Sequence, residues 1–125
     1  MKRRVLAAVD DLFFAAKIRA TAEPLGVAVE FNRDVEAMLA AARAAPPALV
    51  IADLQAQRPD PFALATRMKA DEALRAVPIV GFFAHVQVEL AERARQSGFD
   101  RILARSAFVQ QLPKILTELT QPQDA

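Results

Sequence analysis

The chain has 125 residues, of which 54% are hydrophobic and 25% charged, which suits one globular domain and excludes a disordered chain. Its net charge of +1 argues against a nucleic-acid surface, and no apolar stretch reaches the roughly 18 residues of a membrane span. With no cysteine and with His85 as the single histidine, the chain lacks the residues for a disulfide framework, a zinc site or a Ser-His-Asp triad. We therefore expect a cytoplasmic protein.

In the first part of the chain, short apolar runs alternate with helical patterns. Residues 5–9 form an apolar run that predicts a strand, and residues 12–25 then carry apolar side chains at helical spacing. Gly26 directly after this segment is typical of a helix end. Residues 27–31 predict a second strand, and residues 34–44 predict a second helix that stops before two prolines.

The same alternation continues through the middle of the chain. Residues 48–52 are wholly apolar and predict a third strand. Asp60 suits an N-cap with a proline at the first helical position after it, so a third helix is expected over residues 61–71. Residues 78–83 predict the fourth strand. Apolar runs this short are typical of strands that are buried on both faces.

The last part of the chain completes the pattern. Residues 88–97 predict a fourth helix with few apolar side chains, and residues 102–104 predict a short fifth strand. Ser106 is the expected cap of a fifth helix that runs to about Leu119. We expect one domain over residues 1–120, and residues 121–125 to be a tail or the start of a linker.

Five strands that alternate with five helices predict an α/β fold. The expected architecture is a flavodoxin-like, doubly wound parallel sheet of order 2-1-3-4-5, with two helices on one face and three on the other. In such sheets, ligands bind beyond the carboxyl ends of the strands, where the strand order reverses between the first and third strands.

Three carboxylates fall at that position. Asp10 and Asp11 follow the first strand, and Asp53 follows the third. Such a cluster favours a bound cation, and Mg²⁺ prefers oxygen ligands. A carboxylate facing the ion can also form an acyl phosphate. A structural interpretation stays open beside this one, in which Asp11 caps the first helix and Asp53 accepts hydrogen bonds from loop amides.

Four segments of the chain resemble the response-regulator receiver family of two-component signalling. They occur in the family's order, and the resemblance extends from Arg4 to Leu119. The segments are residues 5–11 (VLAAVDD), 49–54 (LVIADL), 78–84 (PIVGFFA) and 97–105 (SGFDRILAR).

The resemblance implies a role for each residue of the site. It implies that Asp53 accepts a phosphoryl group and that Asp10, Asp11 and Asp53 hold Mg²⁺ weakly. The backbone carbonyl of Gln55 would complete the metal site. Arg105 stands where the family has a lysine and would contact the phosphate, although its planar guanidinium differs from a compact ammonium. Alternatively, Arg105 is a surface residue paired with one of the acids.

The chain departs from the family at the positions that sense the phosphate. Phe83 stands where the family keeps a Thr or Ser whose hydroxyl bonds the phosphoryl group, and it can equally be a core aromatic. Ile102 replaces an aromatic residue that changes rotamer when that hydroxyl moves. Ser106 replaces a proline whose preceding peptide bond is typically cis, and a cis bond before serine would cost about 2.5–4 kcal/mol. We therefore expect a trans bond and a different backbone path into the last helix.

These departures predict an atypical receiver, or pseudo-receiver, that is not an enzyme and acts mainly as a protein-interaction module. The alternative is a working receiver that a histidine kinase phosphorylates on Asp53 in the presence of Mg²⁺. An enzyme on a flavodoxin-like fold is a remote third interpretation, because no glycine-rich phosphate loop follows the first strand. The expected partner is a histidine kinase or another signalling protein, with no nucleic acid or membrane. Homodimers could form through the fourth helix, fifth strand and fifth helix.

Overall fold

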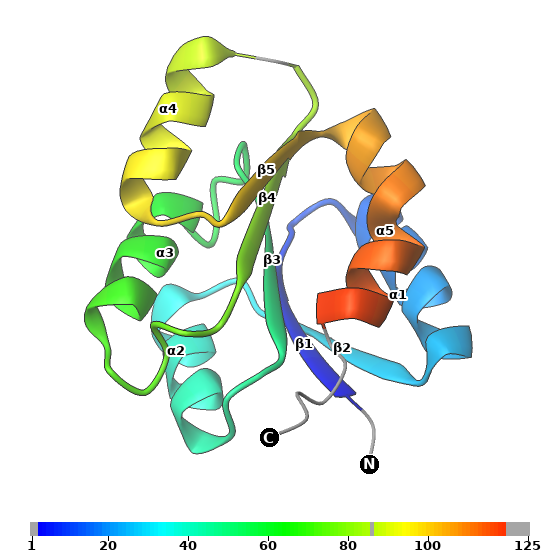
Figure 1. Cartoon of the computed structure of the whole chain (residues 1–125), viewed down its shortest axis with the longest axis horizontal. Coiled ribbons are helices and arrows are strands. Elements are labelled where there is room, and N and C mark those ends of the chain that lie inside the picture. The colour runs from blue at the N-terminus through cyan, green and yellow to red at the C-terminus, as the bar shows by residue number, and fades with distance from the viewer. Residues whose placement is uncertain (1–2, 86, 120–125) are drawn as a thin grey trace.

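A computed structural model describes residues 3–85 and 87–119 as a five-stranded parallel sheet covered by helices on both faces (Figure 1). The strand order is β2-β1-β3-β4-β5, and every neighbouring pair is parallel, as predicted. The strand order reverses beside β1, and in sheets of this kind ligands bind beyond the carboxyl ends of the strands at that point. The strands are β1 (Arg3–Ala8), β2 (Val27–Phe31), β3 (Leu49–Asp53), β4 (Ile79–Phe83) and β5 (Arg101–Ala104).

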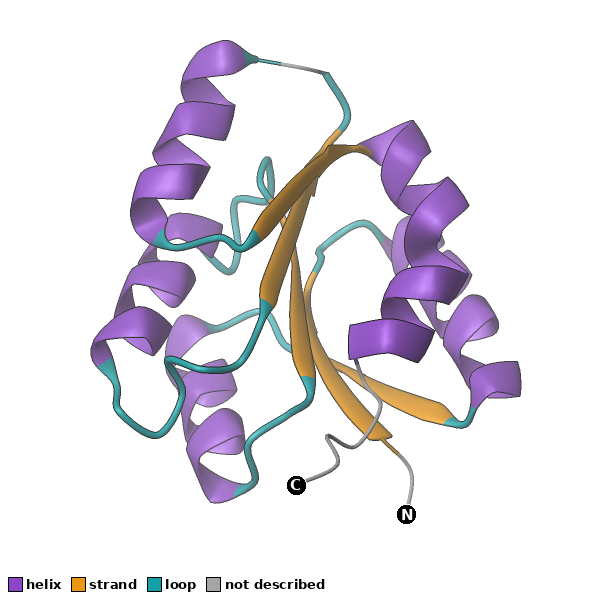
Figure 2. Cartoon of the chain, viewed as in Figure 1, coloured by secondary structure: helices purple, strands orange, loops and turns teal. Residues whose placement is uncertain are grey.

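The helices form two layers, which Figure 2 shows on opposite sides of the strands. Two helices, α1 and α5, cover one face, and three helices, α2, α3 and α4, cover the other (Figure 1). This is the predicted two-and-three arrangement. The helices are α1 (Leu12–Ala22), α2 (Val35–Ala44), α3 (Pro61–Ala70), α4 (Val88–Ser97) and α5 (Arg105–Leu119). No helix among residues 3–85 and 87–119 is long and apolar enough to cross a membrane.

Alternating side chains of the strands divide the apolar core into two clusters. Every residue of β3 and of β4 is buried, which explains why these segments carry almost no polar side chain. On the α1 and α5 side, three aromatic rings form the centre of the core. The Phe82 ring stacks on Phe108 with centroids 4.6 Å apart and lies 4.7 Å from the Phe14 ring.

The helix boundaries follow local chemistry in most places. Asp60 caps α3 through hydrogen bonds from two amides, with Pro61 in the first turn, as the sequence indicated. The first predicted helix is shorter than expected, because α1 ends at Ala22 and the chain continues as a 3-10 turn over Glu23–Leu25. Gly26 then takes a left-handed φ of 72°, a conformation that glycine adopts readily.

The prediction that Ser106 caps the last helix is wrong. The helix α5 begins at Arg105, directly after Ala104 of β5, so Ser106 lies within its first turn. No loop separates the strand from the helix, and therefore no separate capping position exists. The cis peptide bond found in the described part of the chain is Arg58–Pro59, so the bond before Ser106 is trans, as expected. Of the predicted domain, residues 1–2, 86 and 120 lie outside the described residues, as does the proposed tail over 121–125.

Candidate functional site

The register of the sheet brings the predicted acidic residues to one edge. Ala8 at the end of β1 pairs with Ala52, one residue before Asp53 at the end of β3. Asp10 and Asp11 follow β1 after a single residue, Val9, and therefore emerge at the same carboxyl edge as Asp53. This edge is the upper one in Figure 1, where the strands lead into the starts of α1, α4 and α5.

Asp11 is half-buried, and its two carboxylate oxygens have different partners. One oxygen, Oδ1, accepts hydrogen bonds from the backbone amides of Phe13 at 2.9 Å and Phe14 at 3.1 Å, so Asp11 is the N-cap of α1. The other oxygen, Oδ2, lies 3.6 Å from Nη2 of Arg105. The interpretation of Asp11 as a helix cap is thus confirmed, and its Oδ2 faces the Arg105 guanidinium.

The two carboxylate oxygens of Asp53 also have different partners. Asp53 is only 6% exposed, and its Oδ1 accepts a hydrogen bond from the Gln55 amide at 2.9 Å. Oδ2 lies 4.0 Å from Nη2 of Arg105. Burial raises the pKa of Asp53 above its ordinary value, and the charges of Asp10 and Asp11 raise it further. The Gln55 hydrogen bond and the Arg105 charge oppose this rise in pKa without cancelling it.

Arg105 connects the acidic residues to the aromatic core. Its guanidinium carbon lies 4.4 Å from the centroid of the Phe14 ring and 5.8 Å from that of Phe82, which are cation–π distances. Its Nε is buried and has no hydrogen-bond partner among the described residues. Arg105 is thus paired with acidic residues, as its structural interpretation predicted, but it faces both Asp11 and Asp53 and is half-buried rather than a surface residue.

Asp10 is exposed and lines a hollow with Arg33, Gln57 and Arg58. No group of three acidic or histidine side chains within residues 3–85 and 87–119 is arranged to hold a metal ion. Carboxylates are suitable ligands for Mg²⁺ in kind, and the predicted set also includes a backbone carbonyl. Weak Mg²⁺ binding at Asp10, Asp11, Asp53 and the Gln55 carbonyl stays a prediction.

The Gln55 side chain makes a contact across the site that the sequence did not indicate. Its Oε1 accepts a hydrogen bond of 2.7 Å from the backbone amide of Ala84, the residue that follows β4. Its own backbone amide is bonded to Asp53. The amides of Gln55 and Ala84, which follow β3 and β4 at this edge, are therefore both already paired.

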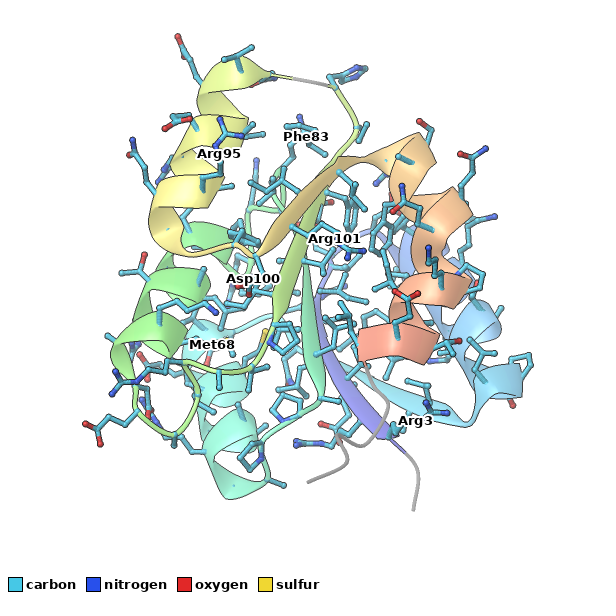
Figure 3. All side chains as sticks on the ribbon, viewed as in Figure 1. Arg3, Met68, Phe83, Arg95, Asp100 and Arg101 are labelled. Carbon is cyan, nitrogen blue, oxygen red and sulfur yellow. The ribbon has the colours of Figure 1, made fainter. Side chains whose placement is uncertain are left out.

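Two of the three altered positions, Phe83 and Ile102, lie on the opposite side of the sheet from Phe14. Phe83 is 4% exposed and belongs to the apolar cluster under α2, α3 and α4, so its interpretation as a core aromatic is confirmed. Figure 3 shows Phe83 near the carboxyl end of the sheet, beside α4. Ile102 is half-buried and packs against the same cluster. Neither side chain offers a hydrogen-bond donor to the acidic site.

The structure thus brings together Asp11, Asp53 and Arg105, with Asp10 near enough to influence the pKa of Asp53. It also adds Phe14 and Phe82, which the sequence marked only as members of an apolar stripe and a strand. The position of Phe14 in the first helical turn, three residues after Asp11, could have suggested that it lies near the site. No local signal indicates that Arg105 would stack on it.

No protein-family model matches the chain, and no curated protein matches it in sequence. Solved structures do match it. It is similar to a response regulator from Hahella chejuensis, with 19% identity, 99% of each chain covered and a TM-score of 0.85. It is also similar to the receiver domain of the sensor histidine kinase PA1611 from Pseudomonas aeruginosa PAO1, which holds a magnesium ion in its active-site cleft. That match has 22% identity, covers 96% of this chain and 98% of the other, and has a TM-score of 0.82.

A third similar structure is the phosphorylated cyanobacterial phytochrome response regulator RcpA. Its identity is 18%, it covers 95% of this chain and 91% of the other, and its TM-score is 0.75. At these identities the comparisons show the fold. The chain has the doubly wound fold of response-regulator receiver domains, with an acidic residue at the end of β3.

Proposed function

We propose that this chain is an atypical receiver module of two-component signalling, which acts mainly by binding another signalling protein. Support comes from the receiver fold, from Asp11 and Asp53 at the carboxyl edge of the sheet, and from the order of the four family-like segments. The partner class is a histidine kinase or another protein of such a pathway. A module of this kind is a signalling protein and not an enzyme.

The observation that carries the atypical part of the proposal is the burial of Phe83. Its ring is packed in the cluster under α2, α3 and α4, where the receiver family has a hydroxyl that moves toward the phosphoryl group. A ligand shifts a conformational equilibrium only through its different affinity for the two states. Without that hydroxyl, a phosphoryl group on Asp53 has little means of favouring one arrangement of β4 over another.

The packing of Ile102 supports the same conclusion. The family's aromatic residue at this position responds to the space that the hydroxyl leaves, whereas Ile102 is a branched aliphatic chain that lies against the Phe83 cluster. The hydrogen bond between Gln55 and Ala84 also links the ends of β3 and β4 directly. We therefore expect partner binding to be constitutive, including any homodimer formed through α4, β5 and α5.

Phosphorylation of Asp53 is the second candidate function, and the buried carboxylate beside Arg105 favours it. An arginine can form two parallel hydrogen bonds to a phosphoryl group. The transfer of such a group depends mainly on positioning and charge neutralisation. The similar RcpA structure is of a phosphorylated protein, and the similar PA1611 domain holds magnesium. In this case Asp53 would carry a phosphoryl group, but Phe83 and Ile102 would still hinder transmission of that signal to α4 and β5.

Two measurements on one sample test the proposal. The chain is treated with acetyl phosphate and Mg²⁺, and intact-mass spectrometry shows whether one phosphoryl group is added, with Asp53→Asn as the control. Hydrogen–deuterium exchange is then compared before and after treatment for residues 88–104. We expect no change in exchange there, whether or not Asp53 is modified. A large, Asp53-dependent change would show that the switch operates and would contradict the proposal.

A further inference from the structure

The guanidinium of Arg105 lies between the two carboxylates that the fold brings together. Its Nη2 is 3.6 Å from Oδ2 of Asp11 and 4.0 Å from Oδ2 of Asp53. These are ion-pair distances rather than hydrogen bonds, so one positive charge is shared by two negative ones. A permanent cation therefore lies beside the acidic residues that follow β1 and end β3.

The other carboxylate oxygens of Asp11 and Asp53 already accept hydrogen bonds from backbone amides. Oδ1 of Asp11 accepts from two amides at the start of α1, and Oδ1 of Asp53 accepts from the Gln55 amide. Within Asp11 and Asp53, the Oδ2 atoms are therefore the oxygens left for a cation, and both face Arg105, whereas the exposed carboxylate of Asp10 lines the neighbouring hollow. A divalent ion that used them would have to displace the guanidinium or tolerate its charge at close range.

Arg105 is also held in place by more than its charge. Its guanidinium lies over the Phe14 ring at 4.4 Å, and that ring packs against Phe82. Its Nε is buried without a hydrogen-bond partner among the described residues, so the favourable contacts of the guanidinium are those with the rings and the acids. The backbone is fixed as well, because Arg105 joins β5 directly to α5.

We infer that Arg105 is a built-in cation which takes the place of a divalent metal ion at this acidic site. The guanidinium neutralises one of the two charges on Asp11 and Asp53, and it weakens divalent-ion binding by occupying the space next to their Oδ2 atoms. The absence of any metal-holding group of three acidic or histidine side chains in the described part of the chain agrees with this. The inference concerns ion binding alone and does not depend on the proposed signalling role.

Replacement of Arg105 tests the inference. Arg105→Met keeps an unbranched, apolar stem over Phe14 while it removes the charge. Calorimetric titration with MgCl₂ is expected to give a dissociation constant about tenfold lower than that of the wild type, because a like charge close to the ion has been removed. Adding Asp53→Asn to this variant should restore weak binding. Arg101→Met is the matched control, because Arg101 is exposed on β5, and its affinity should equal that of the wild type.

Equal or weaker Mg²⁺ binding by Arg105→Met than by the wild type would overturn the inference. If that variant does not fold, an NMR measurement on the wild type tests the inference instead. Its amide NMR spectrum is recorded with one equivalent of Mg²⁺. The signals of Leu54 and Gln55 are expected to shift only slightly, because most of the protein stays unbound. Saturation of these shifts at one equivalent in the wild type but not in Asp53→Asn would show a tight metal site despite Arg105, and would refute the inference.

Discussion

Replacement of Phe83 by threonine restores the hydroxyl that the receiver family has at this position, but we expect it to weaken the fold. Phe83 is 4% exposed and lies in the apolar cluster with Leu54 and Phe99. Removal of a buried phenylalanine ring costs about 3–5 kcal/mol, which combines the lost transfer of apolar surface with the cavity that remains. Against a usual unfolding free energy of about 5–15 kcal/mol, the variant should fold with a much reduced margin.

Urea unfolding followed by circular dichroism measures this loss. The midpoint should fall while the slope with urea concentration stays the same, because the surface exposed on unfolding hardly changes. Phe13→Thr is the matched control, because Phe13 is 92% exposed and its replacement should change the free energy of unfolding by less than about 0.5 kcal/mol. A loss below about 1 kcal/mol for Phe83→Thr would refute the view that Phe83 is held in place by packing.

Three further variants test other parts of the structure. Because the pKa of Asp53 is raised in the folded state, the wild type loses stability as pH rises from the ordinary pKa of an aspartate through the raised one. Asp53→Asn does not titrate there, so its thermal midpoint should rise relative to that of the wild type over this pH range. A difference in midpoint that does not change with pH would contradict this. Gly81→Ala should cost about 1–3 kcal/mol in urea unfolding, because the new Cβ would lie 2.9 Å from atoms of Leu54 and Phe99; an unchanged midpoint would be the contrary result. Asp11→Ala should lose about 1 kcal/mol through the cap of α1, whereas Asp11→Asn keeps a capping oxygen and should lose less; equal losses would argue against the cap.

The strand order and the acidic edge could be predicted because they rest on local patterns. Continuous apolar runs, such as residues 49–52, reveal buried parallel strands, and the topology of such sheets places Asp11 and Asp53 at one edge. Asp60 and Pro61 likewise indicate the start of α3 through short-range hydrogen bonding and a fixed φ. These features need no knowledge of distant packing.

The details that were missed depend on contacts between distant segments. The ring of Phe14 meets Arg105 only because α1 and α5 lie on the same face of the sheet. The hydrogen bond from Ala84 to the Gln55 side chain joins residues 29 positions apart. Ser106 looked like a cap because serine favours that position, but direct continuation of β5 into α5 left no place for one. Only for Ser106 did a local preference predict something else; the other two contacts leave no local signal in the sequence.

The central claim is that a phosphoryl group at Asp53 is not coupled to the surface of α4 and β5. The most direct measurement compares amide NMR spectra of the chain with and without beryllofluoride, a phosphoryl mimic, in the presence of Mg²⁺. We predict shift changes confined to residues near Asp10, Asp53 and Ala84, with the signals of residues 88–104 unchanged. Large shifts across α4 and β5 that disappear in Asp53→Asn would contradict the account and show that the chain is a working receiver.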